Sequence, residues 1–236
     1  MQLIKHKFKN NRFKKHFHTT FSIGYIISGA YEIEIEKKKL IIPHGKIKVI
    51  NPYEVHVASG EWEYINIMPE IEEIKKLSID IANKEEIRFE NIIDDINALM
   101  YLKKLLNSKE DFQKDENLTL FLSELIKNHT KTVQVEFSAN IKPSIEFMHE
   151  NFLKDITLEE IASASNLSKY HFIRIFSKIK KITPYNYLLN LRLEYARNLI
   201  GKMPLALIAQ EANFSDQSHF IKVFKKHFGF TPAMHK

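Results

Sequence analysis

The chain has 236 residues, of which 44% are hydrophobic and 27% charged, and it contains no cysteine. This composition is typical of a globular protein with one or two domains, and it excludes a disulfide framework and a thiolate metal site. The sequence has no apolar run of about 18 residues that could span a membrane. No apolar segment follows the basic N-terminal residues, so the sequence predicts no secretory signal and favours a cytoplasmic protein.

The positive charge is unevenly distributed along the chain. Residues 138–236 hold 14 lysines and arginines against 8 acidic residues, whereas residues 1–137 hold 21 of each. An excess of basic residues in one region is typical of contact with a polyanion, so the C-terminal region is a candidate for binding nucleic acid. A second basic segment, Lys5–Lys15, is compatible with an arm that folds over a pocket, contacts DNA or is disordered.

Residues 16–69 are predicted to form β structure. Runs of β-branched and aromatic residues at 21–27, 31–36, 40–42, 47–50 and 62–68 are separated by turn-forming residues such as Gly29 and Asn51-Pro52. The strict alternation in Tyr31–Glu36 indicates a strand with one buried face. Short strands at this spacing predict a barrel or a sandwich.

Residues 71–127 are predicted to be helical, with helices at 71–81, 91–106 and 116–127. In the second of these, Ile92, Ile96, Leu99 and Met100 share one face. This face either packs against the β domain or forms a dimerisation surface, and the pattern is compatible with both. Residues 128–140 are polar and are expected to link a domain of residues 1–127 to a helical domain of residues 141–236.

The helical domain contains a segment that occurs twice. Leu158–Ser168 matches Leu205–Ser215 with an offset of 47 residues, and His171–Pro184 matches His219–Pro232 with an offset of 48. Thr157 and Glu160 form a capping box, and Ser168 and Ser215 are expected to cap the second helix of each copy. The copies, at about 158–179 and 205–227, each predict a helix-turn-helix unit whose second helix enters the major groove of double-stranded DNA.

The second helix of each unit has one apolar face and one polar face. In the first copy Phe172, Ile175, Phe176 and Ile179 recur at helical spacing and are expected to be buried. The opposite faces and the helix starts predict the DNA-binding residues Ser168, Lys169, Tyr170, Ile173 and Arg174 in the first copy and Gln217, Ser218, His219, Ile221 and Lys222 in the second. Arg174 suits guanine, with a phosphate contact as its alternative, Gln217 suits adenine, and Ile221 suits a thymine methyl group.

The residues that carry this pattern also resemble a known family. Ile161-Ala162, Ser168, His171-Phe172, Thr183-Pro184, Ser215–Phe220 and Gly229 resemble the DNA-binding domain of the AraC/XylS transcription regulators. The resemblance implies a sequence-specific regulator that forms a homodimer and, if it is an activator, contacts RNA polymerase. Lys181 stands where the family usually has a glycine in a left-handed conformation, and Asn213 stands where glycine is common.

The N-terminal domain resembles the cupin-like sensor domain of the same family. The landmarks are His16-Phe-His18, Tyr25–Gly29 and Ile50–His56. The resemblance implies an α+β protein with a β-barrel sensor, a helical dimerisation element and an all-α double helix-turn-helix domain. It also implies a small-molecule effector, for which His16, His18, Tyr25 and His56 are the candidate pocket residues.

The same landmarks argue against an enzyme. Ser22 and Ile23 stand where a cupin metal site has a glutamate, and Lys48 stands where it has a histidine. The sequence therefore predicts no metal, no cofactor and no catalytic residues. The alternative from another class is a cupin-type metal-dependent enzyme with a DNA-binding tail.

Overall fold

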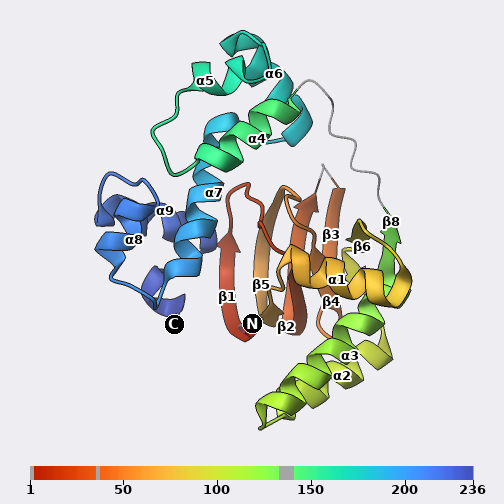
Figure 1. Cartoon of the computed structure of the whole chain (residues 1–236). Helices are drawn as coiled ribbons and strands as arrows, with labels where there is room; N and C mark the ends of the chain where they lie inside the picture. Colours follow the sequence, from red (N-terminus) through yellow and green to blue (C-terminus); the bar gives the residue numbers. More distant parts are fainter. Residues whose placement is uncertain (1–2, 36–37, 133–140, 236) are drawn as a thin grey trace.

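The computed structural model describes residues 3–35, 38–132 and 141–235, and Figure 1 shows a β-sheet between two groups of helices. The strands are β1 (Leu3–Arg12), β2 (Ser22–Ile35), β3 (Lys38–Pro43), β4 (Ile47–Ile50), β5 (His56–Ile67), β6 (Ile87–Phe89), β7 (Ile92–Ile93) and β8 (Thr130–Thr132). The helices are α1 (Ile71–Ala82), α2 (Ile96–Asn107), α3 (Asp111–His129), α4 (Lys142–Asn151), α5 (Leu158–Ser163), α6 (Lys169–Lys180), α7 (Pro184–Leu199), α8 (Leu205–Glu211), α9 (Gln217–Phe228) and the short 3-10 helix η1 (Pro232–His235). Within the described residues, no helix combines the length and the apolar character needed to cross a bilayer.

The main sheet separates two hydrophobic cores. On one face Ile23, Ile47 and Ile67 pack against residues of α1, α2 and α3. On the other face Ile26, Tyr31 and Trp62 share a core with residues of α7, α8 and α9. The protein is therefore an α+β molecule with a β-rich N-terminal domain (residues 3–132) and an all-helical C-terminal domain (residues 141–235).

The main sheet is open, which corrects the expectation of a barrel. Its strands pair in the order β1-β5-β2-β4-β7, and β3 pairs with the second half of β2. Among the described residues no hydrogen-bonded pair joins β1 to the opposite edge. The helices of the C-terminal domain cover the face that a barrel would enclose, so the apolar side chains on this face are buried without closure of the sheet.

The strand β2 joins two strands that the sequence predicts as separate. Gly29, expected in a turn, lies inside β2 with φ of 75°, and a Cβ atom there would lie 2.1 Å from the carbonyl oxygen of Glu61. The register with β5 shifts between Ile26 and Ser28, so Gly29 follows a β-bulge at a site of close backbone approach. The bulge changes which side chains face the C-terminal domain, because Ser22 and Ile26 face it before the bulge and Tyr31 and Ile33 after it.

The basic N-terminal segment is part of the sheet. β1 pairs antiparallel with β5, with an irregularity between Phe8 and Asn11, which excludes the disordered arm considered among the alternatives. Phe8 and Phe13 are buried in the core shared with the C-terminal domain. Lys5 and Lys7 point to the other side, where their amino groups lie 3.0 and 3.9 Å from Glu63.

The helix predicted at 91–106 begins later than expected. The carboxylate of Asp95 accepts hydrogen bonds from the backbone of Asn97 and Ala98 and caps α2, whereas Ile92–Ile93 form β7. The buried residues of α2 are Ala98, Leu102 and Leu105. Ile96 and Met100, expected on the buried stripe, are 83% and 43% exposed. α2 therefore packs on the domain with one face and leaves a second apolar stripe in solvent.

The N-terminal domain extends further than the sequence predicts. α3 runs to His129, and β8 follows at once and pairs with β6. The first five residues of the expected linker, 128–132, therefore belong to these elements. Residues 133–140 of the expected linker lie outside the described residues.

The two helix-turn-helix units repeat their backbone as well as their sequence. The turn residues Asn166 and Asn213 have φ of 55° and 56°, and the residues that end α6 and α9, Lys181 and Gly229, have φ of 58° and 80°. Lys181 thus adopts the left-handed conformation that glycine usually has at this position in the family. The capping box of Thr157 with Glu160 and the cap at Ser168 are confirmed, and Thr183 caps α7.

Two details of the repeat differ from the expectation. Asp216, not Ser215, caps α9, because its carboxylate accepts a hydrogen bond from the backbone N–H of His219 at 2.8 Å. Ser168 and Asp216 are 48 residues apart, so the extra residue of the second copy lies in the turn and the helix starts are equivalent. Ile179, expected in the core, is 38% exposed at the end of α6.

Candidate functional site

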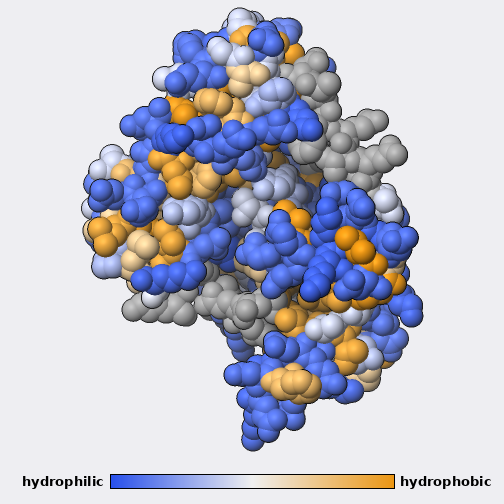
Figure 2. All heavy atoms as spheres, in the orientation of Figure 1, coloured by the Kyte–Doolittle hydropathy of each residue, from blue (hydrophilic) through white to orange (hydrophobic). Residues whose placement is uncertain are grey.

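The second helix of the first helix-turn-helix unit, α6, presents its N-terminal side chains to solvent. Ser168, Lys169 and Arg174 are exposed, Tyr170 is 79% exposed and Ile173 is 36% exposed. Phe172 and Phe176 on the other face are fully buried in a core with α4, α5 and α7. The surface over α5 and α6, at the top of Figure 2, is mostly hydrophilic. This helix can therefore enter a groove of DNA without any rearrangement of its own unit.

The corresponding helix of the second unit, α9, has the same arrangement. Gln217, Ser218, His219 and Lys222 are exposed, whereas Ile221 is half-buried against the core behind the helix. The imidazole Nδ1 of His219 is hydrogen-bonded to the hydroxyl of Ser215 at 3.1 Å. The equivalent helix starts place Gln217 where α6 has Lys169 and Lys222 where α6 has Arg174. The two predicted reading surfaces are thus alike in shape and different in chemistry.

The polar face of α7 holds the C-terminal domain against the N-terminal domain. Asn190, Glu194 and Arg197 lie on one side of this helix, three and four residues apart, and are buried. The amide of Asn190 donates to the carbonyl oxygen of Phe17 at 2.6 Å and accepts from the N–H of Phe17 at 3.3 Å. A carboxylate oxygen of Glu194 lies 2.8 Å from Nδ1 of His18. These contacts fix the segment between β1 and β2 to α7.

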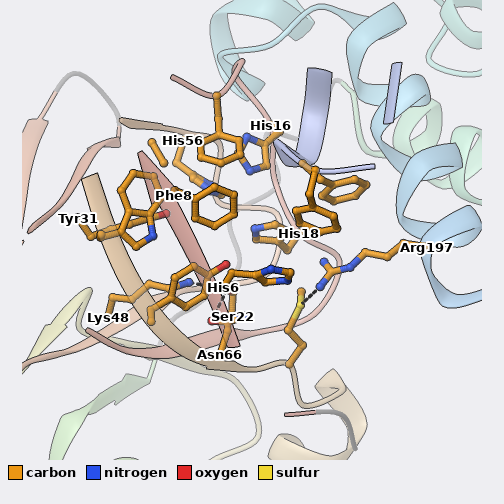
Figure 3. A pocket seen from close by; sticks show the side chains of 17 residues that line it. His6, Phe8, His16, His18, Ser22, Tyr31, Lys48, His56, Asn66 and Arg197 are labelled. Carbon is orange, nitrogen blue, oxygen red and sulfur yellow. Dashed lines mark hydrogen bonds between the residues drawn. The ribbon is translucent and has the colours of Figure 1, made fainter. Parts of the chain in front are cut away.

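A cavity lies where the two domains meet, and Figure 3 shows the side chains that line it. Its volume is about 50 Å³. The N-terminal domain contributes His6, Phe8, Phe13, His16, His18, Ser22, Tyr31, Lys48, His56, Ala58, Trp62, Tyr64, Asn66 and Met68, and the C-terminal domain contributes Arg197, Phe228 and Phe230. The cavity is thus walled by aromatic rings and carries a few polar groups at defined places, which is the usual composition of a small-molecule site.

Three of the four predicted effector residues line this cavity. His16, His18 and His56 come together there, because His16 and His56 form an isolated β-bridge with backbone hydrogen bonds of 3.1 and 2.8 Å. Tyr25 does not line the cavity and packs against the core on the face of the sheet that α1, α2 and α3 cover. It precedes the bulge in β2, where odd-numbered residues point away from the C-terminal domain, so Tyr25 lies outside this cavity.

Lys48 is the most unusual charged residue of the cavity. It is 3% exposed, its ammonium donates to the hydroxyl of Ser22 at 2.6 Å, and it lies 5.4 and 5.3 Å from the ring centroids of Tyr31 and Tyr64. Burial lowers the pKa of Lys48 to about 7, with a further contribution from the positive charge of Arg197. Because a buried cation is stabilised by an anion, Lys48 can supply half of an anion-binding site.

The environment of the cavity histidines favours their neutral form. Burial is the main cause that lowers the pKa of His16, His18 and His56, and it also lowers the pKa of His227 on α9. Repulsion from Arg197 adds to the effect at His18 and His227. The ring of His227 lies 4.9 Å from that of His16 and closes the histidine group from the C-terminal side.

Sequence reasoning missed several residues of the cavity. His6, Phe8 and Phe13 lie on or next to a segment whose lysines drew attention instead. Arg197 belongs to α7, the helix between the two units, as does Glu194, which contacts His18 beside the cavity. A signal was available in α7, because its polar residues at 190, 194 and 197 share one face of the helix and alternate with apolar residues such as Leu191 and Leu193.

Comparisons with known proteins match both domains. The family model described as "AraC-like ligand binding domain" matches residues 2–132, and the one described as "Helix-turn-helix domain" matches residues 161–235. The HTH-type transcriptional regulator YbfI of Bacillus subtilis is 29% identical over 226 residues, which cover 88% of this chain and 81% of that protein. The probable transcriptional regulator LumQ of Photobacterium leiognathi is 32% identical over 92 residues, which cover 38% of this chain and 37% of that protein.

Solved structures of ToxT from Vibrio cholerae have the same fold. One structure, bound to (E)-4-(8-methylnaphthalen-1-yl)but-3-enoic acid, superposes with a TM-score of 0.70 at 14% identity and covers 100% of this chain and 99% of that one. A second, bound to an unsaturated fatty acid, superposes with a TM-score of 0.66 at 14% identity and covers 98% of this chain and 91% of that one. The arrangement of a β-rich domain against a double helix-turn-helix domain is therefore shared along the whole chain.

Proposed function

This chain belongs to the AraC family of helix-turn-helix transcription regulators, and we propose that α6 and α9 contact one asymmetric DNA site. The observation that carries the proposal is the equivalent exposure of the starts of α6 and α9 on opposite ends of α7. Adjacent major grooves on one face of B-DNA are about 34 Å apart, which suits two units held by one connecting helix. The different side chains at equivalent positions imply different base sequences in the two half-sites.

The individual contacts follow from the chemistry of each exposed side chain. Arg174 pairs with guanine, Gln217 with adenine, and Ile173 and Ile221 contact thymine methyl groups. Lys169 and Lys222 contact phosphates, as do the hydroxyl and imidazole groups at the helix starts, Ser168, Tyr170, Ser218 and His219. Among the described residues, Lys169 already has an acidic neighbour in Glu159, so its phosphate contact requires that ion pair to open.

Fluorescence anisotropy with fragments of the source genome tests the DNA-binding proposal. Bound fragments are retested with Arg174→Ala and with Lys75→Ala, an exposed lysine of α1, as the control. We expect Arg174→Ala to weaken binding and the control to have no effect, with a log–log plot of affinity against salt that falls steeply. A flat salt plot, or equal effects of the two variants, contradicts the proposal.

The interdomain cavity is the proposed site of a small organic anion with an apolar body. Lys48 from the N-terminal domain and Arg197 from the C-terminal domain supply positive charge, and aromatic rings supply the apolar walls. The related fold of ToxT holds an unsaturated fatty acid in one structure and a naphthalenyl butenoic acid in another, which supports this ligand class.

The size of the cavity connects the ligand to regulation. A volume of about 50 Å³ admits only a few water molecules, whereas sites for drug-sized ligands measure about 300–1,000 Å³. A larger anion must therefore displace Phe228, the last residue of α9, and Phe230, which follows two residues later. Binding would shift the population between two placements of α9, and with it the affinity for DNA.

Calorimetry with oleate, an unsaturated fatty acid anion, tests the effector proposal. We expect binding by the full chain and a loss of affinity of about tenfold or more in Lys48→Met, since removal of a charged partner costs about 1.5–3 kcal/mol. Lys39→Met, at an exposed position of β3, is the control. Absence of binding, or equal binding by both variants, contradicts an anion site at Lys48.

A second copy of the chain is the proposed partner at α2. The exposed stripe of Ile96 and Met100 borders a groove between α2 and α3 that is also lined by Leu99 and Lys103. An exposed apolar stripe on a helix is typical of a helix–helix interface. Sedimentation equilibrium of Ile96→Glu should show a shift from dimer to monomer, with Leu207→Glu on α8 as the control. A monomeric parent chain contradicts this assignment.

The remaining partners follow from the same family membership. A regulator that activates its promoter also contacts RNA polymerase. We propose that the protein acts in the bacterial cytoplasm and without catalysis, in line with relatives that are named as transcriptional regulators.

A further inference from the structure

The histidine group of the cavity has the arrangement of a metal site, although the sequence pattern argued against one. His16, His18 and His56 each offer a ring nitrogen, and these three nitrogens lie within 4.8 Å of one another. Nitrogens bound to one Zn²⁺ at about 2.1 Å lie about 3.4 Å apart, so small ring rotations bring the three into coordination distance. The cupin pattern does not test this group, because it depends on the glutamate and histidine positions that Ser22, Ile23 and Lys48 occupy.

The hydrogen bonds of the three rings leave one nitrogen of each for a metal. Nδ1 of His16 lies 2.7 Å from the carbonyl oxygen of Lys14, and Nδ1 of His56 lies 2.9 Å from the carbonyl oxygen of Glu54. Nδ1 of His18 lies 2.8 Å from the carboxylate of Glu194. Each oxygen accepts a hydrogen bond from Nδ1–H, so Nε2 of each neutral ring carries the lone pair that binds a metal. Carbonyl and carboxylate partners of this kind also orient the imidazoles of known metal sites.

A fourth imidazole comes from the C-terminal domain. His227 lies in the last turn of α9, is 8% exposed, and its ring is 4.9 Å from the ring of His16. Its Nε2 is buried with no hydrogen-bond partner among the described residues. A buried imidazole nitrogen without a partner is uncommon in folded proteins, and a bound ion would satisfy it. Figure 3 shows the rings of His16, His18 and His56 close together at one end of the cavity.

We infer that His16, His18, His56 and His227 bind a divalent transition-metal ion of the zinc type. Imidazole nitrogens suit zinc, copper and nickel and are poor ligands for magnesium or calcium. Four imidazoles would fill the four positions of a tetrahedral ion, which is the pattern of a structural site and leaves no open position for catalysis. The carboxylate of Glu194, bonded to His18, offsets part of the charge of the ion.

The ion would connect the two domains. Three ligands come from the segment between β1 and β2 and from the start of β5, and the fourth comes from α9. Metal binding therefore stabilises the docked placement of α9, because an ion that binds only this placement favours it by mass action. The site itself does not depend on the proposed DNA or effector functions, and only its regulatory consequence rests on them.

Calorimetry on the full chain, freed of metal by a chelator, tests the site with Zn²⁺ and with Mg²⁺ as the control ion. We expect one Zn²⁺ per chain, no binding of Mg²⁺, and a loss of Zn²⁺ affinity of about tenfold or more in His18→Gln and His227→Gln. His219→Gln and His44→Gln remove exposed histidines outside the group and should leave the affinity unchanged.

Two measurements on the unaltered chain keep the test independent of how the variants fold. Co²⁺ should give the intense visible absorption of a four-coordinate ion. Long-range ¹H–¹⁵N spectra with Zn²⁺ should shift the ring signals of four of the 11 histidines. Absence of one-to-one binding, a six-coordinate Co²⁺ spectrum, or shifts confined to exposed histidines such as His44 and His219 would overturn the inference.

Discussion

The two helix-turn-helix units have the same backbone conformation but pack against different parts of the molecule. Behind α6, the core consists mainly of residues from α4, α5 and α7, with Phe17 as the fully buried contribution from the N-terminal domain. Behind α9, Phe220, Phe224 and Phe228 share one core with strand residues such as Phe8 and Trp62. The difference indicates that α6 is positioned by its own domain and α9 by the N-terminal sheet. A ligand that changes the shape of the cavity should therefore move α9.

The largest expected difference between the units concerns the residues that end α6 and α9. A Cβ atom on Gly229 would lie 2.3 Å from the ring of Phe13, and its φ is 80°. We expect Gly229→Ala to lower the free energy of unfolding by about 4 kcal/mol, since a left-handed alanine costs about 1–2 kcal/mol and overpacking about 1–3 kcal/mol. Urea denaturation measures the change. A loss below about 1 kcal/mol would show that α9 is not held against β1.

The second prediction concerns the charge buried beneath the second unit. The pKa of Lys48 is about 7 in the folded chain and 10.5 when it is unperturbed. Below pH 7 both states hold the proton and the full cost of burying the charge is present. Between pH 7 and 10.5 the unfolded state holds more protons, so this cost declines as pH rises.

Lys48→Met removes that cost. We expect it to raise the free energy of unfolding by about 3 kcal/mol at pH 6, with a gain that shrinks toward pH 10. Denaturation of both proteins across this pH range measures the difference, and the exposed Lys39→Met serves as the control. A gain that does not depend on pH would contradict the assigned protonation of Lys48.

The third prediction compares the contributions of α6 and α9 to DNA binding. We expect Arg174→Ala to weaken binding to the specific site by about 2 kcal/mol and to relax base preference at one position, because bidentate pairing with guanine is lost. Lys222→Ala, at the equivalent position of α9, should weaken binding to all sequences more evenly and reduce the salt slope by about one. Competition binding with single-base variants of the site distinguishes them. An even loss in Arg174→Ala would make it a phosphate contact.

The smallest expected effect lies at the end of α6. Lys181 has φ of 58°, a conformation that glycine adopts without strain. Lys181→Gly should therefore raise the free energy of unfolding by about 1 kcal/mol, opposite in sign to the change at Gly229. Thermal unfolding at matched pH measures the shift, and a destabilised variant would contradict the equivalence of the two helix ends.

The sequence predicts the C-terminal domain more completely than the N-terminal domain, and the reason is physical. Capping residues such as Thr157 and Ser168 act on groups three residues away, so local sequence determines where those helices begin. The left-handed turns at Asn166 and Asn213 are equally local. The cap of α9 was misplaced by one residue because Ser215 and Asp216 are both good capping residues.

The errors in the N-terminal domain come from contacts between distant segments. Gly29 has the same local signature in a turn and beside a bulge, and only the approach of Glu61 distinguishes them. The bulge then reverses the facing of β2, which removed Tyr25 from the cavity. The exposure of Ile96 depends on where Asp95 caps α2, and both faces of that helix are apolar. The polar face of α7 is visible in the sequence, but the partners of Arg197 and His227 could not be predicted, because no local pattern shows which strand a helix will cover.

The most direct test of the account is the sequence that the full chain selects from a random library of DNA duplexes. The account predicts an asymmetric site with two different half-sites about 10–10.5 base pairs apart, one altered by Arg174→Ala and the other by Gln217→Ala. A site with a single half-site, two identical half-sites, or no sequence preference would contradict the claim that α6 and α9 read two different base sequences.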